Sequence, residues 1–476
     1  MTQSFRIHAA DNVEVILVDG ILVPRGHKRA LTDIAKGEMV IKYGHAIGHA
    51  TTDIKQGDHV HTHNVKTNLN DTLSYRYEPT EVAPLPAYEG SFMGYVRNDG
   101  SVGIRNELWI VPTVGCANKT CERLATLIND ELGSVRAFAF PHPYGCSQMG
   151  DDQITTQQTL AGLVRHPNAG GVLVVGLGCE NNNIDAFKKV LFDWDERRVK
   201  FLIMQDEPDE IESGLAILRA LASYADGFVR ERLPLSKLCI GLKCGGSDGL
   251  SGITANPLVG RASDMLVAAG GTTILSEVPE MFGAETVLMA RCPNRELFDQ
   301  LVSLINGFKQ YYVDHNQRVY ENPSPGNKVG GITTLEDKSL GCTQKGGTSL
   351  VRAVLKMNEC VTVPGLNLLE GPGNDIVAVT NLTTSGAHMI LFTTGRGTPL
   401  GAPVPTMKIS TNTALAEAKP TWIDFDAGRL LSGEGVDDLS NAFMDRIIGI
   451  ASGDSLTQNE INQYREIAIF KGGVTL

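Results

Sequence analysis

Residues 242–257 read LKCGGSDGLSGITANP. The apolar run at 237–242 predicts a strand just before them, and residues 258–269 have the pattern of a helix. Cys244 therefore lies where the strand ends, followed by two glycines, a serine and an aspartate. Open α/β sheets bind ligands beyond the carboxyl ends of their strands, and free amides at a helix start attract anions. This stretch predicts an α/β fold with a ligand site at a strand end.

The same pattern of strand, glycine and cysteine occurs three times upstream. ELWIVPTVGC ends at Cys116, AFAFPHPYGC ends at Cys146, and GGVLVVGLGC ends at Cys179. If the four strands lie in one sheet, or in two sheets that face each other, the four thiols can converge. An inert core cysteine is the alternative at each position, because cysteine packs well in interiors. The repetition favours a shared site.

The composition is that of a globular protein too large for one core. The chain has 476 residues, 42% of them hydrophobic and 20% charged, so two or three domains are expected. The formal charge of −12 argues against nucleic acid or a membrane surface as a partner, although a few local cations can still bind an anionic substrate. We find no membrane span and no signal-peptide pattern. Nine cysteines without paired short spacings predict reduced thiols and a cytoplasmic location.

Four segments are predicted along the chain. Residues 1–76 combine short β-rich runs with Gly, Asp and Lys turns, which predicts a small, mainly β module. Residues 77–91 are proline-rich and predict an extended linker. Residues 92–233 and 234–476 each alternate strands with helical stretches. They predict two α/β units with largely parallel sheets.

Histidines mark two places in the N-terminal module. His59, His61 and His63 alternate in GDHVHTHN, so on a strand they would share one face, which suits either a metal or a solvated edge strand. His27 and Lys28 lie in a glycine-flanked turn that can present both to a neighbouring domain. His27 titrates near neutrality, whereas Lys28 needs desolvation or a nearby cation to act as a base.

Basic residues in later loops could hold a carboxylate. Arg105 follows a glycine turn, Lys338 lies in NPSPGNKVGGITTLEDKSLGCTQKGG, and Arg396 stands between two glycines after a predicted strand. A guanidinium can fork onto a carboxylate, although internal pairing is an equally common role. Neither the Lys338 segment nor GVLVVGLGC matches a nucleotide-binding loop, so no nucleotide cofactor is expected.

Several of these strings together resemble the altronate and galactarate dehydratase family, whose superfamily also contains sulfolactate sulfo-lyase. The resemblance covers nearly the whole chain and is carried by GHKRALTDIAKGEMVIKYG, VGIRNELWIVPTVGC, YGCSQMGDDQ, GLGCENN, CGGSDGLSGITANP, EVPEMFGAE, NPSPGNK, GGITTLEDKSLGCTQK and TTGRGTPLG. GDDQITTQQ, EMFGAE, LGCTQK and HVHTHN favour the altronate branch.

The resemblance implies an SAF-type β-clip module at the N-terminus, followed by a two-part α/β catalytic region. It implies removal of water from an aldonate; from altronate the product is 2-dehydro-3-deoxy-D-gluconate, on the route of hexuronate degradation. It also implies dependence on iron. Galactarate dehydratase or sulfolactate sulfo-lyase activity is the nearest alternative, and a sugar-acid binding protein or an electron-transferring iron–sulfur enzyme are others. Whether the chain forms a homo-oligomer is left open.

The chemistry of dehydration assigns roles to these residues. Removing the proton next to a carboxylate requires a cation at that carboxylate, a base, and an acid or metal for the departing hydroxide. The candidates are His27, Lys28, Asp248 and Glu277 for acid–base catalysis, Arg105, Ser247, Lys338 and Arg396 for the substrate, and Cys116, Cys146, Cys179 and Cys244 for iron. Thiolates suit either a ferrous ion or an iron–sulfur cluster. An iron site built from the alternating histidines and a carboxylate is the rival hypothesis.

Overall fold

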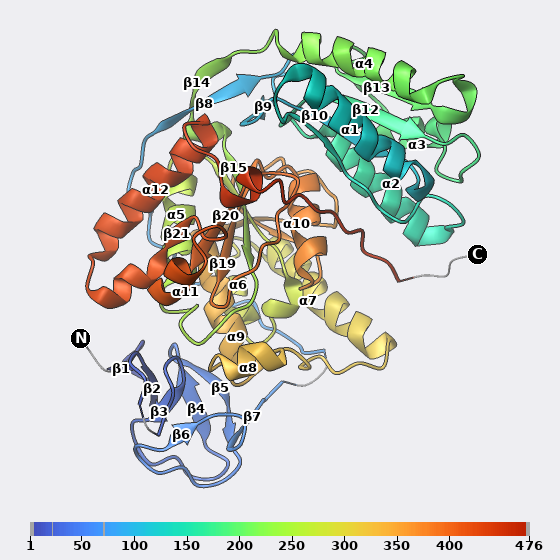
Figure 1. Cartoon of the computed structure of the whole chain (residues 1–476). Coiled ribbons are helices and arrows are strands. Elements are labelled where there is room, and N and C mark those ends of the chain that lie inside the picture. The colour runs from blue at the N-terminus through green and yellow to red at the C-terminus, as the bar shows by residue number, and fades with distance from the viewer. Residues whose placement is uncertain (1–3, 21, 70–71, 473–476) are drawn as a thin grey trace.

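A small β module, a four-stranded α/β domain and a seven-stranded α/β domain follow one another along the chain (Figure 1). They are seen in a computed structural model that describes residues 4–20, 22–69 and 72–472. The strand-rich N-terminus and the two parallel sheets confirm the predicted fold class. Within the described ranges, none of the helices has the length and apolar character needed to span a membrane.

The N-terminal module consists of two small antiparallel sheets, ordered β1–β2–β3–β6 and β4–β5–β7. Its core contains Val13, Val40, Ile47 and Val60, and Leu340 of the third domain packs into the same cluster. The module is therefore seated on the third domain. The strands are β1 (Ser4–Phe5), β2 (Val13–Ile16), β3 (Lys28–Ala30), β4 (Met39–Lys42), β5 (His45–Ala50), β6 (His59–Val60) and β7 (Val65–Lys66).

The segment with the alternating histidines is not a continuous strand. β6 ends at Val60, and residues 61–64 form a turn. Asn64 stabilises this turn, because its Oδ1 accepts the His61 N–H at 2.9 Å and its Nδ2 donates to the His59 carbonyl at 2.9 Å. An asparagine that bonds nearby backbone in this way competes with a strand ladder. The prediction of three histidines along one strand is therefore wrong.

The segment after the module contains neither helix nor strand, and its side chains are anchored. Residues 72–90 contain no helix or strand. The Tyr75 hydroxyl contacts Glu285 and accepts a hydrogen bond from Lys309 at 2.8 Å, and the Tyr77 hydroxyl donates to the Cys292 carbonyl at 3.3 Å. These contacts hold the segment against the third domain.

The second domain is a parallel sheet ordered β11–β10–β12–β13 with helices on both faces. Leu173 and Val175 point to one face, covered by α1 and α4, whereas Val172 and Val174 point to the other, covered by α2 and α3. Burial on both faces explains the uninterrupted apolar run. The elements are β10 (Glu107–Pro112), α1 (Asn118–Leu132), β11 (Ala137–Ala139), α2 (Gly150–Arg165), β12 (Ala169–Gly176), α3 (Ile184–Leu191), β13 (Val199–Ile203) and α4 (Glu210–Ala225).

A three-stranded antiparallel sheet, β14–β8–β9, brings the chain into and out of the second domain. Its strands are β8 (Ser91–Val96), β9 (Val102–Gly103) and β14 (Arg230–Pro234).

The third domain is a parallel sheet ordered β17–β18–β16–β15–β19–β20–β21. Leu275 and Leu391 pack with α5 and α12 on one face, and Ile274 and Ile390 pack with α10 on the other. Because α2 of the second domain lies against α10, the two α/β domains share one hydrophobic core. The strands are β15 (Cys239–Cys244), β16 (Thr272–Leu275), β17 (Val351–Leu355), β18 (Gly365–Leu369), β19 (Met389–Thr394), β20 (Thr406–Ser410) and β21 (Phe425–Asp426). The helices are α5 (Ala255–Ala268), α6 (Glu285–Met289), α7 (Arg295–Asp314), α8 (Pro325–Val329), α9 (Leu335–Cys342), α10 (Asp375–Thr384), α11 (Thr413–Ala418), α12 (Val436–Ser452) and α13 (Gln458–Ile461).

Candidate active site

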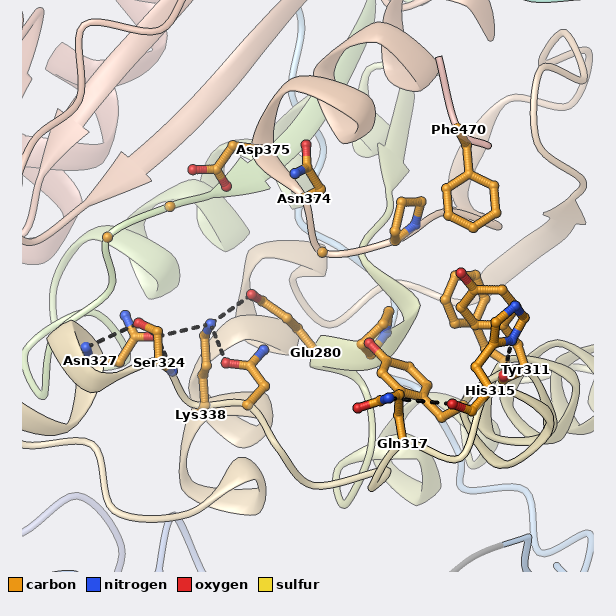
Figure 2. A pocket seen from close by; sticks show the side chains of 18 residues that line it. Glu280, Tyr311, His315, Gln317, Ser324, Asn327, Lys338, Asn374, Asp375 and Phe470 are labelled. Carbon is orange, nitrogen blue, oxygen red and sulfur yellow. Dashed lines mark hydrogen bonds and ion pairs between the residues drawn. The ribbon is translucent and has the colours of Figure 1, made fainter. Parts of the chain in front are cut away.

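A cavity of about 770 Å³ opens at the carboxyl edge of the seven-stranded sheet (Figure 2). Gly245 and Gly246, directly after β15, form part of its wall, and Asn374 and Asp375 at the start of α10 form another part. The rest of the wall includes Glu280, Tyr311, Tyr312, His315, Asn322, Ser324, Asn327, Lys338 and Phe470. A concave site with several polar groups at strand ends suits a small polar ligand.

Lys338, a predicted substrate contact, is a charged group in this wall. Figure 2 shows its side chain between Asn327 and Glu280. Its Nζ lies 2.7 Å from Glu280 Oε1 and donates to Asn322 Oδ1 at 3.1 Å. Burial, the largest single effect, works against the charge of Lys338, but the Glu280 carboxylate with Cys342 and Cys244 outweighs it and raises the pKa of this lysine. Lys338 therefore carries a positive charge at the cavity wall.

Behind Glu280 lies a buried group of sulfur atoms. Cys244 Sγ is 3.0 Å from Glu280 Oε2 and 3.4 Å from Cys342 Sγ, and Cys342 Sγ is 3.2 Å from the same Glu280 oxygen. Lys345 Nζ donates to Cys244 Sγ at 2.9 Å. The bond from Cys342, assisted by Lys345, lowers the pKa of Cys244 to about 6 against the effect of burial, while it raises the pKa of Cys342. The three ligand atoms are close enough together to hold one metal ion.

Glu277, a predicted acid–base group, lies beside this cluster. It contacts Lys243, whose Nζ is also 2.8 Å from Asp375 Oδ1, and Glu277 Oε2 accepts the Cys244 N–H at 3.1 Å. Its backbone is left-handed with φ 69°, an uncommon conformation for glutamate. Burial, with Cys244 and Glu280 nearby, raises the pKa of Glu277. This carboxyl can therefore hold a proton at a pH where an exposed glutamate cannot.

Ser247 and Asp248 shape the loop after β15. The Ser247 carbonyl accepts from Asn327 Nδ2 at 2.8 Å, which ties the loop to the start of α8. Asp248 is half-buried and accepts from Thr411 Oγ1 at 2.9 Å and from Ser251 Oγ at 3.0 Å. Burial raises the pKa of Asp248. Its carboxylate is used within the protein and organises the loop.

A histidine cluster lies where the N-terminal module meets the third domain. The ligand nitrogens of His27, His59 and His61 all lie within 4.8 Å of one another. His27 Nδ1 is 3.0 Å from His59 Nε2, and His27 Nε2 is 3.1 Å from the Val329 carbonyl. Burial, with the neighbouring cations, lowers the pKa of His59 to about 4 and that of His61 to about 3, so both are neutral near pH 7. The turn formed by Asn64, rather than a strand, brings these rings together.

Lys28 binds the module to the third domain. Its Nζ donates to Asp337 Oδ2 at 2.7 Å and to the Gly331 carbonyl at 2.7 Å, while Lys42 donates to the other Asp337 oxygen at 2.8 Å. Burial, only partly offset by Asp337, lowers the pKa of Lys28 to about 8. Lys28 and His27 thus both reach the neighbouring domain.

The two predicted arginine contacts lie in different settings. Arg105 is buried and donates two hydrogen bonds to the Glu460 carboxylate, from Nε to Oε1 at 2.6 Å and from Nη2 to Oε2 at 3.0 Å. Its guanidinium is therefore paired inside the protein. Arg396 is exposed, and its Nη1 donates to the Gly326 carbonyl at 3.3 Å, next to the loop that lines the cavity. Of these two arginines, Arg396 is better placed to meet a ligand.

The four predicted iron-binding cysteines are divided between two sheets. Cys116, Cys146 and Cys179 are exposed on loops of the four-stranded sheet, whereas Cys244 is buried at the end of β15 in the seven-stranded sheet. The sequence assignment did not include Glu280, Cys342 and Lys345, which surround Cys244. Each of these three residues lies in EVPEMFGAE or LGCTQK, two motifs that carry the family resemblance, and these motifs could have identified them from the sequence.

Three protein-family profiles match consecutive parts of the chain. "Altronate/galactarate dehydratase SAF domain" matches residues 20–68, and "D-galactarate dehydratase/Altronate hydrolase, second domain" matches residues 94–226. "D-galactarate/Altronate dehydratase, C-terminal" matches residues 235–475.

Characterised relatives extend over the whole length. The chain is 53% identical to altronate dehydratase of Escherichia coli (strain K12) and 51% identical to altronate dehydratase of Bacillus subtilis (strain 168), in both cases over 100% of each chain. It is 32% identical to galactarate dehydratase (L-threo-forming) of Escherichia coli (strain K12), over 98% of this chain and 96% of that protein.

Proposed function

The chain belongs to the D-galactarate/altronate dehydratase family, and on this premise we propose that it removes water from D-altronate to give 2-dehydro-3-deoxy-D-gluconate. The main support is the full-length identity of 53% and 51% to two altronate dehydratases, against 32% to a galactarate dehydratase. The proposal places the enzyme in the cytoplasm, on the route of hexuronate breakdown.

The cavity is the proposed substrate site. Abstraction of the carbon 2 proton creates a second negative charge on a carboxylate that is already charged, so a cation at that carboxylate is the largest requirement. The buried, protonated Lys338 in the wall supports this role, with Arg396 near the same loop. Asn322, Ser324 and Asn327 offer hydrogen bonds to sugar hydroxyls.

We assign a ferrous ion to His27, His59 and His61. The Val329 carbonyl can only accept a hydrogen bond, so His27 carries its proton on Nε2 and its Nδ1 lone pair faces His59. Thr333 Oγ1, 3.0 Å from His61 Nδ1, orients the third ring. Hydrogen-bond partners of this kind fix the tautomer and the ring orientation of metal-binding histidines, and neutral imidazoles are suitable ligands for iron. When bound, the ion would supply Lewis-acid chemistry at a carboxylate or hydroxyl oxygen.

Lys28 and Glu277 are the leading acid–base candidates. An effective acid or base has a pKa close to the working pH. Lys28 meets this condition with a pKa of about 8, and the pKa of Glu277 is raised by its burial. All four candidates have partners within the protein, so the pKa is the ground for this preference. His27 contacts the Val329 carbonyl, and Asp248 accepts from Thr411 and Ser251.

The test is an anaerobic assay of the purified, iron-supplemented chain with altronate, galactarate and sulfolactate, without an electron acceptor. We expect 2-keto acid to form from altronate. Turnover of galactarate or sulfolactate alone would favour a related lyase, and binding of altronate without turnover would favour a binding protein.

Lys338→Gln tests the substrate site. It should lower kcat/KM for altronate about 10- to 100-fold, the effect of losing a hydrogen bond to a charged group. Lys338→Arg should recover part of the loss, and the exposed Lys237→Gln is the matched control. Equal activity of Lys338→Gln and Lys237→Gln would remove Lys338 from the site.

A further inference from the structure

Cys116 and Cys179 leave adjacent strands at the same level of the second domain. β10 and β12 are parallel and pair Pro112 with Val175. Cys116 is the fourth residue after Pro112, and Cys179 is the fourth after Val175. The pairing continues past the strand end, because the Thr113 N–H donates to the Val175 carbonyl at 2.9 Å. The two loops that carry these cysteines therefore leave the carboxyl edge of the sheet side by side.

The loop that carries Cys146 lies between these two loops. On one side the Gly115 N–H donates to the Tyr144 carbonyl at 2.8 Å, and on the other the Asn182 N–H donates to the Gly145 carbonyl at 3.0 Å. Ser147, just after Cys146, donates its N–H to Asn181 Oδ1 at 2.9 Å. The residues that flank Cys146 are thus bonded to the loops of both other cysteines.

Close packing and a buried carboxylate hold the three loops together. A Cβ atom on Gly145 would lie 2.0 Å from the Thr113 carbonyl oxygen, so the backbones are in direct contact. Glu180, next to Cys179, is buried and accepts from Thr113 Oγ1 at 2.7 Å and from the Gly178 N–H at 2.6 Å. These contacts join the Cys179 loop to the Cys116 loop and leave little freedom for either.

The exposure of these cysteines separates them from most others in the chain. Free cysteine is usually buried, as are Cys121, Cys239 and Cys292 here. Cys116, Cys146 and Cys179 are exposed, unbridged, and gathered at one edge. From this juxtaposition we propose that they hold an iron–sulfur cluster in the second domain, separate from the histidine cluster.

The spacing favours a cluster over a single ion. Three sulfurs bound to one tetrahedral ion at about 2.3 Å lie about 3.8 Å from each other. The three sulfurs here, all in described loops, do not lie within 4.8 Å of one another, unlike the Cys244, Glu280 and Cys342 ligand atoms. A cluster of several irons can bind thiolates that lie farther apart, and thiolates are the usual ligands of iron–sulfur centres. Because these centres normally have four protein ligands, three thiolates leave one iron open to an oxygen ligand.

The cysteine edge borders the cavity through the C-terminal segment. Phe470 lines the cavity, as Figure 2 shows, and Lys471 lies 4.8 Å from the centre of the Tyr144 ring in the Cys146 loop. The C-terminal segment therefore connects the proposed sugar-acid site to the loop that carries Cys146. A role of the cluster in turnover of the sugar acid rests on the proposed dehydratase function, whereas binding of the cluster does not.

The test measures iron and acid-labile sulfide per chain after anaerobic reconstitution with ferrous iron and sulfide, together with electron paramagnetic resonance after reduction. The full-length chain should hold about two to four irons with matching sulfide, and one further iron without sulfide for the ion proposed at the histidine cluster. The triple variant Cys116→Ser, Cys146→Ser, Cys179→Ser should lose the sulfide and the resonance signal. Cys360→Ser is the matched control, because Cys360 is exposed but lies near Arg165, at the opposite end of α2 from the Cys146 loop.

Two results would overturn the proposal. The first is that the triple variant retains sulfide. The second is that the unaltered chain binds iron but no sulfide, and that this iron is lost in His59→Ala. In either case turnover of altronate by the unaltered chain would leave the proposed function standing. A chain that binds the cluster through the three cysteines, yet turns over none of the sugar acids, would keep this inference and refute the function. Thermal unfolding of each variant shows whether it is folded.

Discussion

The two α/β domains bring cysteines to the ends of their strands in opposite surroundings. In the four-stranded sheet, Cys116, Cys146 and Cys179 are exposed and none pairs with a basic side chain in the described contacts. In the seven-stranded sheet, Cys244 is buried and contacts Lys345. The same sequence pattern thus produces an accessible edge in one domain and a sealed, charged network in the other.

The difference arises from what covers each edge. Helix α9 and the turn after it place Cys342 and Lys345 over the end of β15, and the turn after β16 supplies Glu277 and Glu280. In the four-stranded sheet the edge is formed by short loops that bind one another. Access of a ligand is therefore decided by the connections, not by the strands.

The largest expected effect concerns the sealed network. Lys243→Met leaves Glu277 and Asp375 without their shared cation, and loss of one partner of a buried ion pair costs about 3–5 kcal/mol. The free energy of unfolding, measured with denaturant, should fall by this amount. Arg295→Met is the control, because its pair with Asp299 is exposed and should change the same quantity by less than about 0.5 kcal/mol.

A partner substitution sharpens this experiment. Adding Glu277→Gln to Lys243→Met should recover part of the loss, because it removes a buried carboxylate whose remaining cation, Lys345, lies 3.7 Å away. Equal destabilisation by Lys243→Met and Arg295→Met would show that the network around β15 is open to water, and the contrast between the two sheets would fail.

The next effect, which is smaller per unit of pH, follows from the pKa of Cys244. The folded protein lowers this pKa from 9.0 to about 6, chiefly through the bond from Cys342. Between pH 6 and 9 the unfolded chain then binds more protons, so the contribution of Cys244 to stability rises with pH, by up to about 1.4 kcal/mol per unit. It is complete above pH 9 and is lost as the pH falls through 6. We expect the difference in unfolding free energy between the unaltered chain and Cys244→Ser to follow this slope.

The matched control is Cys179→Ser, an equally conservative change at the exposed edge. Its difference in unfolding free energy, measured over the same pH range, gives the baseline for an exposed cysteine. A profile for Cys244→Ser that matches this baseline would mean that no thiolate is stabilised beside Lys345.

The strands are predictable from the sequence, because apolar runs such as that of β12 are buried on both faces. Sequence analysis also placed Cys244 at a strand end. It could not predict the surroundings of Cys244, because Cys342 comes from a helix 98 residues away in the chain. Arg105 shows the same limit, since its partner Glu460 is 355 residues distant. Local pattern determines which residues reach an edge, whereas long-range packing determines what they meet there.

The histidines show a local limit as well. Alternation in HVHTHN predicted a strand, but one side chain, Asn64, formed a turn instead. The third ring of the cluster is His27, 32 residues earlier, rather than His63. Short polar residues that bond the backbone can thus override a period-two pattern.

The smallest change in stability is expected at the exposed edge, where reactivity gives the clearer measurement. Serine at Cys116, Cys146 or Cys179 should alter the free energy of unfolding by no more than about 0.5 kcal/mol, as surface substitutions usually do.

In the cluster-free native chain, an alkylating reagent should modify these three thiols and Cys360 rapidly, and should reach Cys244 only after unfolding. After reconstitution the three should be protected while Cys360 still reacts, because only bound ligands are shielded. Rapid alkylation of Cys244 in the folded chain would erase the distinction between the two edges, whereas unchanged labelling of the three thiols after reconstitution would show that the accessible edge holds no cluster.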